Sequence, residues 1–432
     1  MATFKKFIQT IQQSGNNGRD FEIFCKWFLE NDTYWAKQIE KVWLWNDWPD
    51  KWGPDRGIDL IFKHKNGEVW AIQAKCYDEK YSVTKRDMDT FLSESNRPKI
   101  GHRLLMASTD DISKNAMDTC AGQEKPVTLF LLRSFEEANI FYPDNISALS
   151  DVRPIDKPHP DPHQERAIED VISGFEQSDR GQLIMACGTG KTFTTLWIKE
   201  RLEVQTTLVL VPSLNLLSQT LSEWCLGASS NFDILCVCSD SSVSRRDMED
   251  VSISEAPFPV TSDLSEIASF LSKKDKKVIF CTYHSSELIA EIQKDSSIDS
   301  FDLIIADEAH RCAGKKGSMF SLVLDDNKIR GVKRLFTTAT PRLYAESVKK
   351  SAWDKGIEIY GMDNEDVFGP KFHTLTFSQA IEKNLLADYQ VIIVGVDEPM
   401  VKSWIDNQKL LAVNDEVSSD ARTLAAKIGL LK

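Results

Sequence analysis

Three side chains between positions 57 and 76 have the types and spacing of a metal-dependent phosphodiesterase. The stretch "GIDLIFKHKNGEVWAIQAKC" contains Asp59, Gln73 and Lys75. An aspartate is a hard oxygen ligand for Mg²⁺, and the amide carbonyl of a glutamine can supply a second oxygen. A metal held there generates hydroxide and stabilises charge on the phosphate, while a lysine positions the water or neutralises the developing charge. These residue types therefore predict cleavage of a phosphodiester.

The local pattern predicts how the chain brings these groups together. Side chains alternate along a strand, so Gln73 and Lys75 share one face of "EVWAIQAK". The Asn-Gly pair at 66–67 is a hairpin signal, which folds "IDLIF" back as the antiparallel neighbour and brings Asp59 near both. The competing interpretation is an edge hairpin whose glutamine and lysine are ordinary solvated residues.

A second chemical site is predicted at "MACGTGKT" (185–192), which follows an apolar strand and precedes a helical pattern. Two glycines let the backbone approach phosphate oxygens, and the amides and dipole at a helix N-terminus favour the anion. The lysine would reach the β and γ phosphates of ATP, and the threonine hydroxyl would bind Mg²⁺. The residues predicted to bind the nucleotide here are Gly188, Thr189, Gly190, Lys191 and Thr192.

"LIIADEAH" (303–310) is an apolar strand that ends in two acids. Ligands of parallel α/β sheets sit at the carboxyl ends of strands. Asp307 would hold Mg²⁺ through water, and Glu308 would orient and deprotonate the water that attacks the nucleotide. The order of the two segments therefore predicts an ATPase.

The segments "GTGKT", "DEAH" and "TTATPR" (337–342) together resemble the first three motifs of superfamily 2 helicases and translocases. "LVPSLNLLSQT" and "TYHS" resemble further motifs of that family, the latter a strand-contacting one. The resemblance implies ATP hydrolysis coupled to movement on nucleic acid. It implies an adenine-reading role for Gln164, a coupling role for His310, and a relay of the nucleotide state to DNA through the motif residues Thr338, Ala339 and Thr340.

The N-terminal pattern resembles the PD-(D/E)xK nuclease core, in the Mrr-like branch where QxK replaces (D/E)xK. That branch also carries a glutamate on its first helix. "GRDFEIFCKWFLEN" (18–31) fits this place, with an apolar face of phenylalanines and Glu22 on the polar face. The resemblance implies that Glu22 completes the metal site of Asp59 and Gln73, with Lys75 as the catalytic lysine.

The chain divides at "DVRPIDKPHPDPHQ", whose four prolines exclude a helix or a central strand. Beyond it, strand-like runs at 182–187, 207–211, 277–282, 301–306 and 334–338 alternate with helical patterns, which predicts a parallel α/β sheet. We expect an α/β protein with four parts. They are an Mrr-like nuclease core with a mixed sheet (1–150), a linker (151–163), a first RecA-like lobe (164–388) and the start of a second lobe (389–432).

Composition narrows the class of protein. The formal net charge is −13 over 432 residues, which argues mildly against a uniformly basic nucleic-acid footprint. The nine cysteines include no CxxC pair, which favours reduced thiols over disulfides or a zinc site. No apolar run approaches the ~18 residues of a membrane span, and the N-terminus lacks a signal peptide. These features predict a cytoplasmic protein without a membrane partner.

An Mrr-like nuclease followed by a superfamily 2 motor resembles the N-terminal part of single-polypeptide Type ISP restriction-modification enzymes. The resemblance implies double-stranded DNA as partner, with ATP and Mg²⁺ as cofactors. It also implies methyltransferase and target-recognition domains on the same longer polypeptide, because no methyltransferase motif occurs in these 432 residues. Three alternatives stay open: a stand-alone helicase-nuclease in phage defence or repair, a degenerate nuclease fold that serves the motor as a DNA-binding module, and an RNA helicase.

Overall fold

The computed structural model describes residues 3–54, 57–125, 127–151, 155–239, 256–354, 356–388, 410–412 and 418–420. The chain separates into two compact units, Met1–Ala380 and Ile381–Lys432. The first unit contains a five-stranded and a seven-stranded sheet, and each carries its own hydrophobic core. No helix among the described residues is long and apolar enough to cross a membrane.

The five-stranded sheet is mixed, with strand order β1-β2-β3-β4-β5. The first three strands pair antiparallel, and β3, β4 and β5 pair parallel. The strands are β1 (Ile39–Leu44), β2 (Leu60–His64), β3 (Val69–Lys75), β4 (His102–Ala107) and β5 (Val127–Phe130). The helices of this part are α1 (Phe4–Gln12), α2 (Asn17–Asn31), α3 (Trp35–Gln38), α4 (Lys85–Glu94), α5 (Lys114–Ala121) and α6 (Leu132–Glu137).

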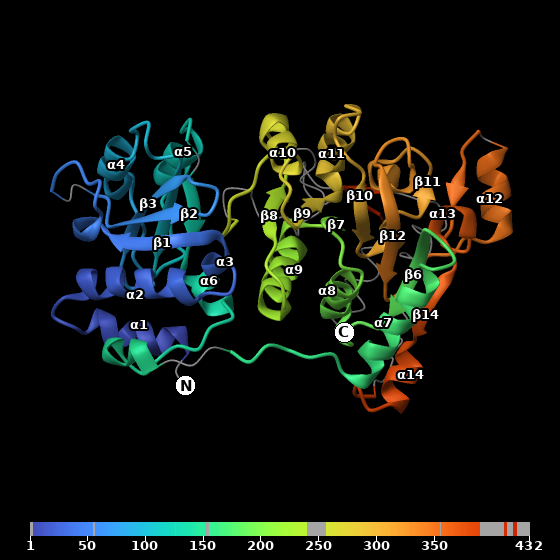
Figure 1. Ribbon diagram of the computed structural model, residues 1–432, viewed down its shortest axis with the longest axis horizontal. Helices are drawn as coiled ribbons and strands as arrows, with labels where there is room; N and C mark the ends of the chain where they lie inside the picture. Colours follow the sequence, from blue (N-terminus) through green and yellow to red (C-terminus); the bar gives the residue numbers. More distant parts are fainter. Residues whose placement is uncertain are drawn as a thin grey trace. The chain divides into compact units, whose positions relative to one another are not determined.

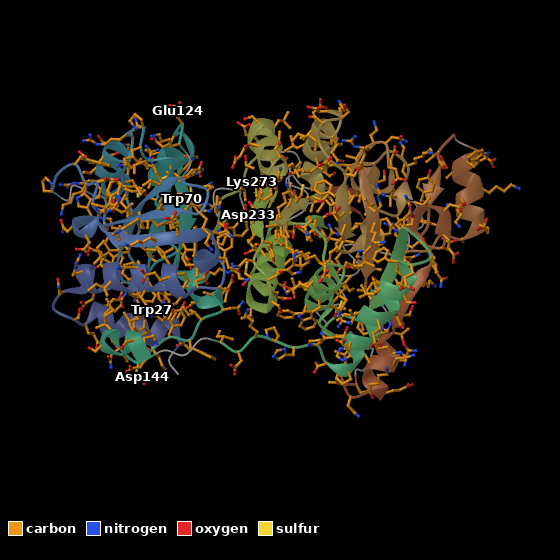
Figure 2. All side chains as sticks on the ribbon, in the orientation of Figure 1. Trp27, Trp70, Glu124, Asp144, Asp233 and Lys273 are labelled. Carbon is orange, nitrogen blue, oxygen red and sulfur yellow. The ribbon has the colours of Figure 1, made fainter. Side chains whose placement is uncertain are left out.

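Two layers of helices cover this sheet. Helices α1 and α2 pack on one face and α4 and α5 on the other (Figure 1). Side chains alternate between the two faces of β3. Trp70 and Ile72 therefore pack in the hydrophobic cluster between the sheet and α2, whereas Ala71 packs in the cluster between the sheet and α4. Trp70 of β3 and Trp27 of α2 are labelled in Figure 2. The predicted hairpin is confirmed, because β2 and β3 pair antiparallel around the turn that contains Gly67.

The seven-stranded sheet has the order β14-β6-β12-β10-β7-β9-β8, and every pair in it is parallel. Its strands are β6 (Arg180–Met185), β7 (Thr206–Val211), β8 (Asp233–Val237), β9 (Lys277–Thr282), β10 (Phe301–Ala306), β12 (Gly331–Thr338) and β14 (Lys371–Leu375). The five expected runs correspond to β6, β7, β9, β10 and β12, and the predicted parallel α/β lobe is confirmed. The edge strands β8 and β14 were not predicted.

The helices around this sheet are α7 (Pro162–Gly174), α8 (Lys191–Arg201), α9 (Leu214–Gly227), α10 (Leu264–Leu271), α11 (Ser286–Ile292), α12 (Glu346–Trp353), α13 (Glu365–Phe368) and α14 (Phe377–Glu382). Helices α10 and α11 lie on one face of the sheet, and α7, α8 and α9 lie on the other (Figure 1). At the β8 edge, the ion pair of Asp233 with Lys273 (3.5 Å) places charge beside an edge strand, and Figure 2 labels both side chains.

Two further pairs of short strands lie outside the two large sheets. β11 (Gly314–Lys315) and β13 (Ile359–Tyr360) form a two-stranded antiparallel ladder, which ties the chain after "DEAH" to the chain after "TTATPR". In the second unit, β15 (Leu410–Ala412) pairs with β16 (Ser418–Asp420). The pattern at 418–432 reads as a helix, but its first three residues form β16. The rest of it and the strand-like run at 389–397 lie outside the described residues.

Candidate functional site

The first candidate site lies where β2 begins and β3 ends. The amide nitrogen of Gln73 donates to Oδ2 of Asp59 at 3.0 Å, and the backbone N–H of Ala74 donates to the same oxygen at 2.7 Å. The register explains this contact, since Leu60 pairs with Ile72 and therefore places the preceding acid beside the end of β3. Gln73 is buried at 3% exposure, so its amide is held against the carboxylate rather than solvated.

Lys75 lies on the same face of β3 as Gln73. Burial acts to raise the pKa of Asp87, but hydrogen bonds from Thr84 and Tyr77 lower it, and the charge of Lys75 adds to that lowering. The ammonium group of Lys75 is therefore within electrostatic range of the first turn of α4, on the side of the sheet opposite α2.

Glu22 comes from the α2 side and pairs with Arg19 at 2.9 Å. Burial raises the pKa of the Cys25 thiol well above its usual value, and the charges of Cys76, Asp59 and Glu22 raise it further. Both carboxylates therefore act on the same thiol at the junction of α2 and β3. The structure brings Asp59 and Gln73 into contact, and it places Glu22 of α2 close enough to act on the same thiol as Asp59.

The donor set at this site suits a hard divalent cation, because it consists of carboxylate and amide oxygens rather than thiolates or imidazoles. Within the described residues, no group of three or more His, Cys, Asp or Glu side chains is arranged to hold a metal ion. Asp59 and Gln73 are the pair that could hold a Mg²⁺ ion here, and the role of Glu22 as a third ligand stays a prediction.

The second candidate site is built on the loop between β6 and α8. Gly188 and Gly190 have φ angles of 80° and 76°, the left-handed region that glycine enters without a steric penalty. The loop closes on itself through the Thr189 hydroxyl, which donates to the carbonyl of Ala186 at 2.7 Å. It leads directly into α8 at Lys191, so the first-turn amides of that helix face the loop, as an anion requires.

Gln164 supports this loop in the structure. Its Oε1 accepts from the backbone N–H of Asp161 at 2.8 Å, and its Nε2 donates to the carbonyls of Thr189 (3.4 Å) and Gly190 (3.3 Å). His163 Nε2 lies 3.1 Å from the same Thr189 carbonyl. The start of α7 therefore holds the phosphate-binding loop, while adenine reading by Gln164 stays a prediction.

Charges of opposite sign meet across the loop. The Nζ of Lys191 lies 3.0 Å from Oε1 of Glu308 and 3.8 Å from Oδ1 of Asp307. The hydroxyl of Thr337 donates to Oδ1 of Asp307 at 2.6 Å. Burial raises the pKa of Asp307, and Lys191 and Thr337 oppose that shift.

A polar chain continues from Glu308 towards "TTATPR". The Nδ1 atom of His310 lies 3.2 Å from Oε2 of Glu308 and 3.1 Å from the hydroxyl of Thr338. The Thr338 hydroxyl also accepts from the backbone N–H of Thr340 at 3.2 Å. Burial lowers the pKa of His310, and the charge of Glu308 partly compensates. The predicted coupling residues thus lie in one continuous set of contacts, although their role in coupling stays a prediction.

Two contacts of this site were not foreseen. Thr337 holds Asp307, and the indole Nε1 of Trp224 on α9 donates to the carbonyl of Thr192 at 3.1 Å. Thr337 stands in the "TTATPR" segment, one place before a threonine that the motif did single out. Nothing in the sequence around Trp224 links it to a residue 32 positions earlier.

Comparison with known proteins gives two family matches. Residues 30–150 match the model of a family described as restriction endonuclease, and residues 157–343 match the family described as Type III restriction enzyme, res subunit. A solved structure described as the ATP-dependent Type ISP restriction-modification enzyme LlaBIII bound to DNA is 31% identical, with a TM-score of 0.76. The alignment covers 93% of this chain and 27% of the LlaBIII chain.

Two sequence relatives match more than half of the chain. The probable helicase A859L of African swine fever virus is 30% identical over 248 residues, 57% of this chain and 25% of that protein. The endonuclease subunit of the Type I restriction enzyme EcoAI of Escherichia coli is 23% identical over 258 residues, 59% of this chain and 26% of that protein. This chain spans about a quarter of the length of each relative. It carries a restriction-endonuclease domain followed by a helicase domain, and its fold is similar to the corresponding part of a Type ISP enzyme.

Proposed function

We propose that this chain is the cutting and ATP-binding part of an ATP-dependent restriction enzyme. Its N-terminal domain cleaves the phosphodiester backbone of DNA in the presence of Mg²⁺, and its helicase domain drives movement along double-stranded DNA by ATP hydrolysis. The observation that carries the proposal is the presence of both sites in one chain: the Asp59–Gln73 pair on one sheet and the Lys191–Glu308–His310 set on the other. The similarity to an ATP-dependent enzyme bound to DNA supports it.

In the nuclease step, Asp59 and Gln73 would hold Mg²⁺, and Glu22 would be the third protein ligand. When bound, the ion would supply a water of lowered pKa and neutralise charge on the phosphate. The backbone N–H of Ala74 donates to one oxygen of Asp59. The Asp59 carboxylate is therefore already oriented before DNA binds. Lys75 orients the attacking water or neutralises the phosphorane-like charge, because it projects from the same face as Gln73.

In the ATPase step, the nucleotide competes for a lysine that is already paired. Lys191 leaves Glu308 for the β and γ phosphates, and Glu308 is then available to take a proton from the attacking water. Thr192 and Asp307 would hold the Mg²⁺ that accompanies the nucleotide, and Thr337 keeps Asp307 in place. His310 and Thr338 carry the change at Glu308 to the "TTATPR" segment.

The chain covers 27% of the similar restriction-modification enzyme. We propose that methylation and target recognition belong to further domains of the same polypeptide, and that double-stranded DNA is the track.

The test is nicking of supercoiled plasmid with Mg²⁺ by the chain, by Asp59→Ala and by Lys191→Ala. Nicking that is lost only in Asp59→Ala supports an autonomous nuclease at this site. Equal nicking by all three proteins would contradict the assignment of the nuclease site to Asp59. DNA binding without any nicking favours a degenerate nuclease fold that serves the motor as a binding module. Competition between RNA and duplex DNA for stimulation of the ATPase tests the nature of the track.

A further inference from the structure

The hydroxyl of Tyr283 lies against the peptide that joins the two acids of the ATP site. Tyr283 stands in the 3-10 helix Tyr283–Ser285 at the end of β9 and is fully buried. Its hydroxyl donates to the carbonyl oxygen of Asp307 at 2.7 Å. That carbonyl belongs to the peptide immediately before Glu308, so the hydrogen bond fixes the plane from which the Glu308 side chain projects.

Glu308 needs such support because its backbone is strained. Its φ and ψ are 47° and 45°, in the left-handed region that few residues other than glycine occupy. Conformations of this kind persist only where the surrounding structure over-determines them. Here the peptide before Asp307 is held by a bond from its N–H to the carbonyl of Leu210 (2.9 Å), and the peptide after it is held by Tyr283.

Tyr283 is itself held in place, and its hydroxyl stays protonated so that it can donate. Its ring packs on Phe320 at a centroid distance of 5.3 Å, and its carbonyl accepts from the hydroxyl of Ser286 at 2.7 Å. Burial raises the pKa of Tyr283 well above its usual value, so the phenol keeps its proton. The left-handed turn in turn aims the Glu308 carboxylate at Lys191 (3.0 Å) and His310 (3.2 Å).

We propose that Tyr283 is a positioning residue for ATP hydrolysis: its hydroxyl holds the Asp307–Glu308 peptide in the orientation that lets Glu308 serve as the base. The role differs from contact with a nucleic-acid strand, which is what the "TYHS" segment resembles. It rests on the proposed ATPase activity of the helicase domain.

The test is Tyr283→Phe, which removes one oxygen and keeps the ring. Tyr142→Phe is the matched control, because the hydroxyl of buried Tyr142 also donates to a backbone carbonyl, that of Phe135, in the nuclease domain. We expect Tyr283→Phe to lower kcat for ATP hydrolysis about tenfold, which corresponds to about 1.4 kcal/mol. The Kd for ATP with Mg²⁺ should change less than about twofold, because the interaction acts on the base rather than on binding.

Amide hydrogen exchange supplies a readout that needs no turnover. Exchange of the peptide spanning 307–311 should accelerate about tenfold in Tyr283→Phe, while the rest of β10 and the control variant stay unchanged. Unchanged exchange there overturns the proposal, as does an equal loss of kcat in Tyr142→Phe. A wild-type chain that fails to bind ATP refutes the proposed function instead. In a chain that binds ATP without hydrolysing it, the exchange at 307–311 alone decides the positioning role.

Discussion

The ammonium nitrogen of Lys191 lies 3.0 Å from a carboxylate oxygen of Glu308. In this arrangement the lysine that should bind phosphate neutralises the acid that should activate water. Both side chains are largely buried, at 11% and 24% exposure, so the pair is shielded from solvent. In the proposed mechanism, nucleotide binding exchanges one partner of the lysine for another, and Glu308 is free to act as a base only when ATP has taken Lys191 away.

Lys191→Ala should abolish ATP hydrolysis, with a loss of at least about 100-fold, because it removes the charge that meets the phosphates. It should also reduce stability more at high than at low pH. Burial raises the pKa of Asp307 and Lys191 opposes this shift, so the variant holds the Asp307 proton more tightly in the fold. A group whose folded pKa is raised makes the fold lose stability as pH rises. Turnover assays and thermal unfolding at two pH values check both effects.

The control for that variant is Lys349→Ala. Lys349 lies on α12 and forms ion pairs with Glu346 of the same helix and with Asp363, which precedes α13. Its loss should leave turnover unchanged, and any change in the pH dependence of unfolding should come from Asp363, whose pKa Lys349 lowers. A Lys191→Ala protein that hydrolyses ATP at the wild-type rate would contradict the assignment of the phosphate-binding loop.

Gln73→Glu should make the nuclease domain depend on Mg²⁺ for its stability. The substitution replaces an amide donor 3.0 Å from Asp59 by a second carboxylate. Without metal, two adjacent like charges at a part-buried site and a lost hydrogen bond should cost about 1–3 kcal/mol. Mg²⁺ should recover most of that loss, because a divalent cation favours the additional carboxylate. Thermal unfolding in EDTA and in Mg²⁺ measures the difference.

Gln123→Glu is the matched control in the same domain, since the Gln123 amide donates to the carbonyl of Thr119 at 3.0 Å. We expect no Mg²⁺ dependence there. If Gln73→Glu unfolds at the same temperature as wild type in EDTA, the contact between Asp59 and Gln73 does not form in solution.

Asp32→Asn should stabilise the chain near neutral pH. Burial raises the pKa of Asp32 to about 6, although its carboxylate accepts from the backbone N–H groups of Tyr34 and Trp35. The folded state therefore holds the proton more tightly than the unfolded chain, and stability falls as pH rises from about 4 to about 6. An asparagine keeps an oxygen acceptor without the charge. The gain should approach about 2–3 kcal/mol at about pH 7.5 and vanish at about pH 4.

Asp263→Asn should behave in the opposite way, which makes it the comparison for Asp32→Asn. Hydrogen bonds from Ser265 and the backbone of Glu266 lower the pKa of this exposed carboxylate at the start of α10. Its stabilising effect is present above the ordinary aspartate pKa and disappears as pH falls. Denaturant titrations at several pH values give both curves. If the free energy of unfolding of Asp32→Asn runs parallel to that of wild type from pH 4 to 7, the pKa of Asp32 is not raised in the folded state.

Gly190→Ala should weaken nucleotide binding by at least about tenfold. The φ of +76° is strained for any residue with a Cβ, and a Cβ would lie 2.1 Å from Nε2 of Gln164. The Gln164 amide would have to swing away, which breaks its hydrogen bonds to the carbonyls of Thr189 and Gly190. Gly15→Ala is the control, because nothing lies within 4 Å of a Cβ there. Titration with a fluorescent ATP analogue measures the two affinities, and equal affinities would show that the loop geometry is not needed.

The sequence predicted the interior of the fold better than its edges. Most residues of β6, β7, β9, β10 and β12 are buried, so each of these strands contains a largely apolar run. β8 and β14 lie at the edges of the sheet, and their partly exposed residues mix polar and apolar types. Edge strands of this kind lack the pattern on which the prediction depends.

Within the two sites, contacts between residues close in the chain were predicted better than contacts between distant elements. The Asp59–Gln73 contact was predictable, because strand alternation and a two-residue turn fix it within 15 positions of the chain. The contact of Tyr283 with Asp307 joins the ends of two different strands, and the contact of Trp224 with Thr192 joins two helices. Such pairs depend on how parallel strands and crossover helices stack, which a single sequence does not encode in its spacing.

The strand β14 has a practical consequence for anyone who shortens this chain. It pairs with β6, the strand that leads into the phosphate-binding loop, yet it comes from residues 371–375, beyond the end of the family match at 343. A protein cut at that match would leave β6 with an unpaired edge of backbone N–H and carbonyl groups, a template for aggregation. Soluble expression of the isolated helicase domain should therefore require a C-terminus beyond Leu375.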